Sequence, residues 1–396
     1  MTRFDTQERR RRLQTRQLLT PETRSGDMAA VADAMVALHA TDPATVYLSA
    51  WARMSSGSQT DLADALYVHR RLIRMMGMRR TVFVVSAALA PVVQASSAPA
   101  VAATQRRRLV TQLKQAAVAE DVERWLSEVS DGTLAALERR GSAYAADLVE
   151  DEPRLNTVLD LLPDKAYAVP QKVTSRILTI LALEGKIIRG RPLGGWRGTR
   201  NQWWPTRAWI PGGLGALDED TARQDLLRHW LRTFGPAPIA DIAWWTGWTS
   251  RQTRAALEFL DTVEVDLDGG CGLVLADDLD STPEPEPAAA LLPALDPTPM
   301  GWFHRDWFLG EHRAALFDRT GNIGPTIFWQ GRVVGGWAQR PDGVIRARLL
   351  EDIGTAGAAA VDARVAELTT WLGPLRVIPS FRTPLERELA DPTGSG

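Results

Sequence analysis

The stretch ARQDLLRHWLRTFGPAPIADIAWWTGWTSRQTRAALEFL, residues 222–260, contains three helical segments separated by glycine and proline. In residues 222–234 the leucines and the tryptophan recur on one face, which predicts an amphipathic helix. The Gly-Pro pair that follows ends this helix, and residues 238–246 predict a short second helix that stops before Gly247. Two helices joined in this way are typical of a helix-turn-helix.

The third helix of this stretch and the residues after it predict a wing. Ser250 is the expected N-cap of a helix over residues 251–260. Two strand-like segments follow, 263–267 and 273–275, joined by Asp-Gly-Gly. A helix-turn-helix followed by a β-hairpin is a winged helix, so we assign residues 218–280 to one winged-helix unit.

Two more units of the same kind precede it, because helical segments again lead into pairs of strand-like segments. Residues 116–217 form the second unit, with expected helices over 133–140, 143–148 and 173–183 and wing strands over 186–189 and 202–204. Residues 1–115 form the first unit, with an N-terminal arm, expected helices over 28–38, 44–54 and 60–67, and strands over 72–76 and 81–85.

The sequence changes character after a linker rich in proline, glutamate and alanine, residues 280–290. Short strands and a helix over 358–372 then predict a β-rich, barrel-like domain, residues 281–396. Its expected strands are 314–318, 326–329, 332–337, 345–349 and 375–378. The predicted fold class is therefore α+β: three tandem winged-helix units followed by a C-terminal β-barrel-like domain.

Composition excludes several classes of protein. The single cysteine, Cys271, excludes a disulfide framework, and the five scattered histidines match no zinc pattern. The longest uncharged stretch, residues 81–105, has an apolar core too short to span a bilayer and is interrupted by prolines. We therefore expect a cytoplasmic protein without metal, cofactor or membrane anchor.

The net charge of −2 hides two segments of opposite sign. Residues 261–286 contain nine acidic residues and no basic one, whereas residues 186–217 contain six basic residues and no acidic one. The basic segment covers the expected wing of the second unit. Arginine accounts for 42 of the 46 basic residues, and its planar guanidinium is suited to bidentate phosphate contacts. A solvated face is the alternative interpretation of each run.

Several stretches, in order along nearly the whole chain, resemble the AlkZ-like family of tandem winged-helix DNA glycosylases. They are VALHATDPATVYLSAWARM (36–54), LIRMMGMRRTVFVV (72–85), LALEGKIIRGRPLGGWRGTRNQWWPTRAWIP (181–211), FGPAPIADIAWWTGWTSRQTRAAL (234–257), LLPALDPTPMGWFHRDWFLG (291–310) and FDRTGNIGPTIFWQGRVVGGW (317–337). The resemblance implies a monomeric, monofunctional glycosylase acting on damaged double-stranded DNA. Its expected substrates are bulky or N7-alkylated purines, including adducts or interstrand crosslinks of genotoxic antibiotics.

The family carries a Gln-apolar-Gln motif that positions water for base excision, and His39-Ala40-Thr41, followed by Asp42, stands at that position here. A purine alkylated on N7 is already a cationic leaving group, so the site must supply water and stabilise an oxocarbenium-like cation. His39 is the candidate base, Thr41 can hold the water, and Asp42 can favour the cation electrostatically. The catalytic candidates are thus His39, Thr41 and Asp42.

A structural role explains the same residues. Asp42-Pro43 forms an N-cap and N1 pair for the helix over 44–54, and Thr41 can share that capping. His39, placed at the end of the preceding helix, can instead be a hydrogen-bonded histidine between packed helices.

The DNA-binding candidates lie in two expected wings and at the start of one recognition-like helix. They are Arg79, Arg80, Lys186, Arg189, Arg191, Trp196, Arg197, Arg200, Ser250, Arg251, Gln252 and Arg254. Trp196, at a glycine-rich wing tip, is the candidate wedge that probes the duplex. We expect most of the other tryptophans, including Trp209, Trp244 and Trp245, to pack in the core.

Two other functions fit parts of the pattern. A non-catalytic winged-helix protein, either a regulator or a lesion shield, would bind DNA with the same wings, but no spare dimerisation helix is visible. The tryptophan-rich surface could instead sequester an aromatic drug without DNA. Release of a damaged base distinguishes the glycosylase from both alternatives.

Overall fold

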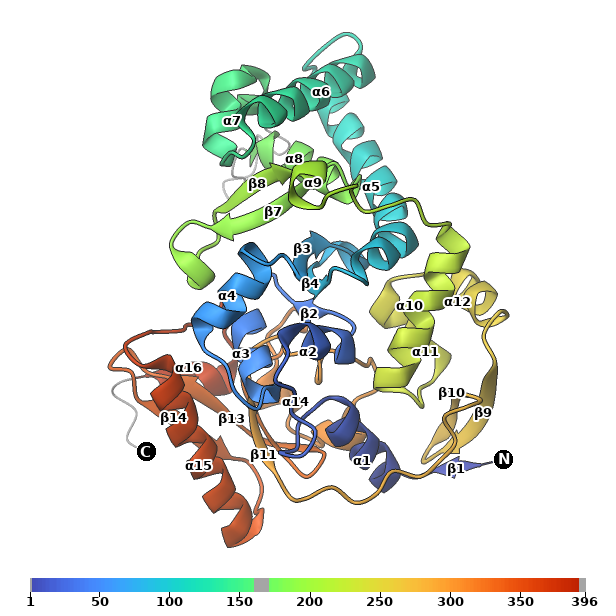
Figure 1. Cartoon of the computed structure of the whole chain (residues 1–396), viewed down its shortest axis with the longest axis vertical. Coiled ribbons are helices and arrows are strands. Elements are labelled where there is room, and N and C mark those ends of the chain that lie inside the picture. Colours follow the sequence, from blue (N-terminus) through green and yellow to red (C-terminus); the bar gives the residue numbers. More distant parts are fainter. Residues whose placement is uncertain (1, 160–170, 392–396) are drawn as a thin grey trace. The chain divides into compact units, whose positions relative to one another are not determined.

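The computed structural model describes residues 2–159 and 171–391, which form two compact units (Figure 1). Unit 1 comprises the described residues up to Leu72, Phe83–Ser86, and those from Gln224 onward. Unit 2 comprises Ile73–Val82 and the described residues between Ala87 and Arg223. The division into four sequence domains remains a prediction.

The first part of unit 1 corrects one expected helix. The helix expected over 28–38 ends at Ala34, because Val36 adopts a positive φ of 60° that no helix can continue through. Leu38–His39 is instead strand β2, which pairs antiparallel with β4 (Val82–Ser86). The other elements here are β1 (Arg3–Phe4), α1 (Thr6–Arg16), α2 (Met28–Ala34), α3 (Pro43–Arg53) and α4 (Gln59–Tyr67).

The stretch quoted first folds in the predicted order, with three helices followed by a hairpin. These elements are α10 (Glu219–Phe234), α11 (Ile239–Thr246), α12 (Ser250–Leu257), β9 (Thr262–Leu267) and β10 (Gly270–Leu275). Gly247 ends α11 in the left-handed conformation, as predicted. The expected N-cap is wrong by one residue: Thr249, rather than Ser250, accepts the backbone N–H of Gln252. Strand β1 adds to this hairpin, parallel to β9.

The C-terminal strands form an open sheet with the order β11–β12–β13–β14, and no closed barrel occurs among the described residues. Its strands are β11 (Ala289–Leu292), β12 (Thr326–Trp329), β13 (Arg332–Gln339) and β14 (Ile345–Leu349). Helices α15 (Gly354–Leu372) and α16 (Pro384–Ala390) pack against it (Figure 1). Three expectations fail: the linker over 280–290 runs into β11, residues 314–318 belong partly to helix α14 (Arg313–Leu316), and 375–378 forms no strand.

The helices of unit 2 pack around a main apolar core, and a smaller buried cluster is formed by Met76, Ala98, Ala102 and Leu183. Its helices are α5 (Ala90–Gln115), α6 (Val122–Arg140), α7 (Ala145–Asp151), α8 (Thr174–Leu183) and α9 (Thr206–Trp209), with short 3₁₀ turns at Met78–Arg80, Pro153–Asn156 and Gly195–Arg197. Its strands are β3 (Leu72–Met76), β5 (Val158–Leu159), β6 (Gln171–Lys172), β7 (Ile187–Pro192) and β8 (Asn201–Pro205). The antiparallel hairpin β7–β8 confirms the expected strands around the glycine-rich tip.

The described helices include none long and apolar enough to cross a membrane. The other element outside these groups is α13 (Asp306–Leu309), a single turn that contains Trp307 and lies shortly after Trp302.

Candidate functional site

His39 is positioned by a strand rather than by a helix end. In β2 its backbone lies opposite Phe83 of β4, and the two rings meet edge to face with centroids 5.6 Å apart. The residue is only 9% exposed. The imidazole is thus fixed by the sheet pairing and by aromatic packing, which limits its motion and leaves a small accessible part.

Asp42 confirms the capping interpretation. Its Oδ1 accepts the backbone N–H of Ala44 at 3.2 Å, at the start of α3, and Pro43 occupies the first turn. Its Oδ2 accepts the backbone N–H of Ser380 at 2.8 Å. Both carboxylate oxygens are therefore engaged, and Asp42 is 5% exposed. Thr41, between His39 and Asp42, is exposed and can meet solvent.

Aromatic side chains extend from Phe83 into the core of unit 1. Trp245 lies 6.5 Å from Phe83 between centroids, and Trp230 stacks on Phe234 at 5.4 Å. Phe234 in turn meets Trp302 edge to face at 5.0 Å. Trp209 and Trp245 are buried, as expected, and Trp244 is half-buried.

Unit 1 contains a histidine–carboxylate pair that no sequence pattern indicates. His304 Nδ1 lies 3.0 Å from Oδ1 of the fully buried Asp241, which also accepts the backbone N–H groups of Phe303 and His304. Burial raises the pKa of Asp241 above its ordinary value. The His304 side chain is 57% exposed, so this pair presents an oriented imidazole to solvent. The two positions lie 63 residues apart in the chain, and this spacing gave no sequence signal.

The hairpin of unit 2 divides the predicted DNA-binding arginines into two groups. Arg191, Arg197 and Arg200 are exposed, whereas Arg189 is 9% exposed and lies over the Trp203 ring at 4.6 Å. Burial, and then the positive charge of Arg74, lower the pKa of Arg189 to about 9. Exposed arginines can reach phosphates directly, but Arg189 cannot without a ligand that enters the protein.

The other hairpin candidates differ in exposure. Lys186 is exposed and pairs with Glu184 at 2.9 Å, and Trp196 is half-buried in the turn at the wing tip. Arg79 and Arg80 both have positive φ angles. Burial lowers the pKa of Arg79 to about 10, whereas Arg80 is exposed and donates to Gln105 Oε1 at 3.1 Å.

Helix α12 presents three of its four candidates to solvent. Ser250, Arg251 and Arg254 are exposed. Gln252 has a structural task, because its Oε1 accepts the backbone N–H of Thr249 at 3.0 Å in a capping box. The exposed side chains form the part of this helix that can contact nucleic acid.

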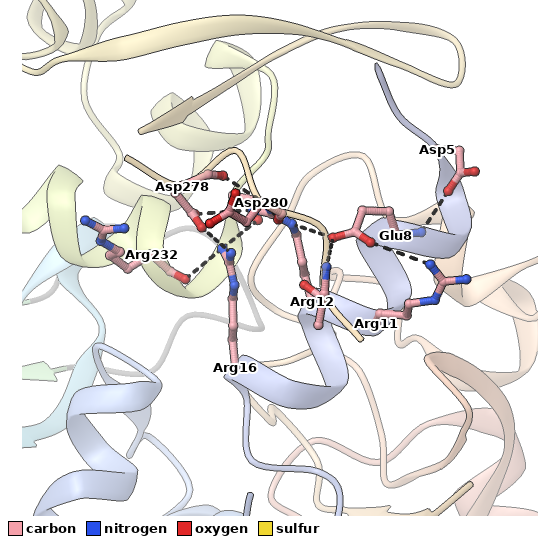
Figure 2. A network of polar contacts seen from close by, with 10 residues as sticks. Asp5, Glu8, Arg11, Arg12, Arg16, Arg232, Asp278 and Asp280 are labelled. Atoms are coloured by element: carbon pink, nitrogen blue, oxygen red, sulfur yellow. Dashed lines mark hydrogen bonds and ion pairs between the residues drawn. The ribbon is translucent and has the colours of Figure 1, made fainter. Parts of the chain in front are cut away.

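The acidic segment is paired with arginines of the N-terminal helix (Figure 2). Arg12 is 1% exposed; its Nε donates to Glu8 Oε1 at 2.9 Å and its Nη1 lies 3.3 Å from Asp278 Oδ2. Arg16 Nη2 donates to Asp278 Oδ1 at 2.6 Å, and Arg232 pairs with Asp277. These contacts neutralise acidic charge within unit 1. Among the described residues, no group of three His, Cys, Asp or Glu side chains is arranged to hold a metal ion.

Comparison with known proteins identifies a family and a similar solved structure. The family described as "DNA glycosylase AlkZ-like" matches residues 32–371. Among solved structures, the Streptomyces sahachiroi DNA glycosylase AlkZ has a similar fold, with a TM-score of 0.71 and 19% sequence identity over 93% of this chain and 98% of that chain. No curated protein matches the sequence.

Proposed function

The chain belongs to the AlkZ-like DNA glycosylase family and is a DNA glycosylase, and we propose that it excises bulky or N7-alkylated purines from double-stranded DNA. Adducts and interstrand crosslinks of genotoxic antibiotics fall within this substrate class. The observation that carries the proposal is the family match over residues 32–371, which includes all three catalytic candidates. The same match favours an enzyme over the non-catalytic DNA-binding and drug-sequestering alternatives.

We assign different tasks to the three catalytic candidates. His39 accepts a proton from the attacking water, since an imidazole titrates near neutral pH and its fixed position in β2 favours one orientation. Thr41, which is exposed, holds that water. Asp42 already accepts two backbone N–H groups, so it acts through its negative charge on the oxocarbenium-like cation rather than by proton transfer.

DNA binding is assigned to wings and to one helix start. We infer three winged-helix units, with the exposed arginines of the β7–β8 hairpin and of α12 contacting phosphates. Trp196 at the hairpin tip would probe the deformed duplex. No partner subunit is required for this arrangement, and we propose a monomer.

The test is release of 7-methylguanine from a methylated duplex by wild-type protein and by His39→Ala. General acid–base catalysis contributes about 10²–10⁴-fold, so we expect base release to fall by a factor in this range. The affinity for the same duplex, measured by fluorescence anisotropy, should change little. Asp42→Asn should lower the rate while keeping one of the two backbone hydrogen bonds.

The matched control is His69→Ala, which removes an exposed histidine of unit 1 outside the candidate site. It should release base at the wild-type rate. Wild-type protein that binds methylated and drug-modified duplexes but releases no base would contradict the proposed substrates. Equal rates for His39→Ala and His69→Ala would remove His39 from the mechanism.

A further inference from the structure

Unit 2 contains a cavity of about 490 Å³ between helices α7 and α8 and the β7–β8 hairpin. Its volume lies in the range of about 300–1,000 Å³ that is typical of small-molecule sites. The buried residues of its lining are Thr174, Leu178, Trp203 and Arg189. Ala146 and Arg200, also in the lining, are exposed and belong to its mouth.

Arg189 is a buried cation whose electrostatic surroundings are unfavourable. Its Nη1 donates no hydrogen bond to any residue within the described ranges 2–159 and 171–391. The carboxylate in the cavity lining, Asp147, accepts the backbone N–H of Tyr144 at 2.8 Å and so caps α7. The nearby charge that affects the pKa of Arg189 is another cation, Arg74, and this pKa of about 9 leaves Arg189 protonated at neutral pH.

The contact with Trp203 does not offset this burial. A cation–π contact offsets only part of the free energy that burying an ion costs. An anion bound in the cavity against the guanidinium of Arg189 would supply the missing counter-charge. The Arg189 side chain is already positioned for an anion, because its backbone pairs with that of Trp203 in the β7–β8 hairpin. Trp203 in turn pairs with Ala143.

The residues that line the cavity indicate which kind of molecule would carry the anionic group. Two guanidiniums, of Arg189 and Arg200, suit a phosphate monoester, which carries about −1.5 to −2 charge at pH 7, better than a carboxylate. A phosphate fills only a small part of the cavity. The indole of Trp203 and the side chain of Leu178 provide an apolar surface for a planar ring beside it.

We propose that this cavity binds a mononucleotide unit, with its phosphate on Arg189 and its base against Trp203 and Leu178. The unit is either a free 5′-mononucleotide or the 5′-phosphorylated terminal nucleotide of a DNA strand. This site goes beyond the proposed glycosylase chemistry, and its test does not depend on base release.

The first experiment titrates the full-length protein with 2′-deoxyguanosine 5′-monophosphate by calorimetry. Deoxyguanosine and inorganic phosphate serve as the two halves of the ligand. We expect the nucleotide to bind at least roughly tenfold more tightly than either half, because a charge-assisted hydrogen bond is worth about 1.5–3 kcal/mol. Phosphate binding as tightly as the nucleotide would contradict the base site.

Variants then test the assigned residues. Arg189→Met removes the cation with similar side-chain length and should weaken nucleotide binding by roughly tenfold or more. It should also raise the melting temperature without ligand, since a buried charge is removed. Ala146→Trp should block the mouth and abolish binding while leaving the interior unchanged. The control, Arg107→Met, removes an exposed arginine of α5 outside the cavity lining and should bind like wild type.

A third arm separates the two sources of the nucleotide. A short DNA strand with a 5′-phosphate is compared with the same strand lacking it, in competition with the free nucleotide. Displacement by the phosphorylated strand alone assigns the site to DNA ends, and displacement by neither strand assigns it to free nucleotides. The proposal is overturned if wild-type protein binds neither the nucleotide nor the phosphorylated strand, or if Arg189→Met binds as wild type does.

Discussion

His39 and Asp42 lie three residues apart, but their surroundings suit them to different tasks. Both oxygens of Asp42 accept backbone N–H groups, one of them from Ser380, so this carboxylate stabilises the start of α3 in addition to its proposed electrostatic role. The His39 ring meets an aromatic edge and is almost buried. Loss of activity on changing Asp42 therefore needs a stability measurement beside it, whereas His39→Ala tests the chemistry more directly.

A buried ion pair fixes α3 at its other end. Arg53 and Asp296 are both fully buried and meet in a two-pronged contact, with Nη1 to Oδ2 at 2.8 Å and Nη2 to Oδ1 at 2.7 Å. Ser49 Oγ also donates to Asp296 Oδ2 at 2.7 Å, and Arg53 donates to Thr298 Oγ1 at 2.7 Å. The two charges thus compensate each other. Removing either residue would leave the other buried without its counter-charge.

We expect Asp296→Ala to lower the free energy of unfolding by about 3–5 kcal/mol, because Arg53 would remain buried without its counter-charge. Urea unfolding followed by circular dichroism measures the change. Asp362→Ala, which removes an exposed carboxylate of α15, should stay within about 0.5 kcal/mol of wild type. The double variant Arg53→Met/Asp296→Leu should regain much of the loss. Equal effects of Asp296→Ala and Asp362→Ala would show that the pair contributes little.

Local signals predicted some of these residue roles and not others. The Asp-Pro pair at 42–43 predicted an N-cap, and the structure confirms it. The strand environment of His39 depends on pairing with β4, more than 40 residues away, and on a valine at positive φ, which sequence patterns rarely indicate. The ion pair of Asp296 joins positions 243 residues apart, so its spacing carried no information.

At the scale of elements, the β7–β8 hairpin separates arginines with different exposure. Arg191 and Arg197 point to solvent from the outer part of the hairpin, whereas Arg189 is buried beside Trp203. Exposed cations that neutralise phosphates release counterions from DNA, and a buried one does not. The wing predicted as one basic stripe therefore has two functions in our interpretation, one toward the DNA backbone and one toward the cavity.

We expect Arg191→Ala and Arg197→Ala each to weaken binding to undamaged duplexes of any sequence. Each should reduce the slope of log affinity against log salt by about 1, as for one lost phosphate contact. Fluorescence anisotropy at several salt concentrations measures both quantities. Arg189→Met should leave the slope unchanged. A slope equally reduced by all three variants would show that Arg189 also reaches the backbone.

Element boundaries followed the sequence where turn residues marked them. Strands β12 and β14 match their expected ranges, because Gln330-Gly331 follows the first and Asp342-Gly343 precedes the second. The short apolar run at 314–318 was ambiguous between strand and helix, and the structure makes its first part helical. Helix α6 extends eleven residues before its expected start at 133, since polar residues diluted its apolar face.

At the scale of the whole molecule, much of the opposite charge is paired between distant parts of the sequence. Arg3, Arg12 and Arg16 of the N-terminal arm contact acids between 266 and 278. In the sequence, residues 261–286 form an acidic run without any basic residue. Its contacts within unit 1 show that part of this charge is used to hold the arm, which net charge alone could not indicate (Figure 2).

The first residues of the arm are held by hydrogen bonds to the Asp268 carboxylate, and the strength of these contacts depends on pH. Arg3 Nη2 donates to Asp268 Oδ1 at 2.9 Å, and the backbone N–H of Thr6 donates to Oδ2 at 2.8 Å. The hydrogen bond from Arg3 first, and then that from Thr6, lower the pKa of Asp268 to about 2. Because this folded-state pKa lies below the ordinary 3.8, the stabilisation is present above pH 3.8 and is lost as the pH falls through about 2.

We therefore expect acid to release the arm locally. In Arg3→Ala the release should occur at higher pH, because the pKa of Asp268 would return toward 3.8. Cys271, the single cysteine, is exposed on β10 opposite Asp266, and a polarity-sensitive dye attached there reports whether β1 still covers the hairpin. Arg319→Ala, an exposed arginine outside the arm, is the control and should titrate like wild type. Because the contact is at the surface, added salt should also loosen the arm. An emission that stays constant between pH 5 and pH 2, or a midpoint unmoved by Arg3→Ala, would show that the strand pairing of β1 holds the arm without Asp268.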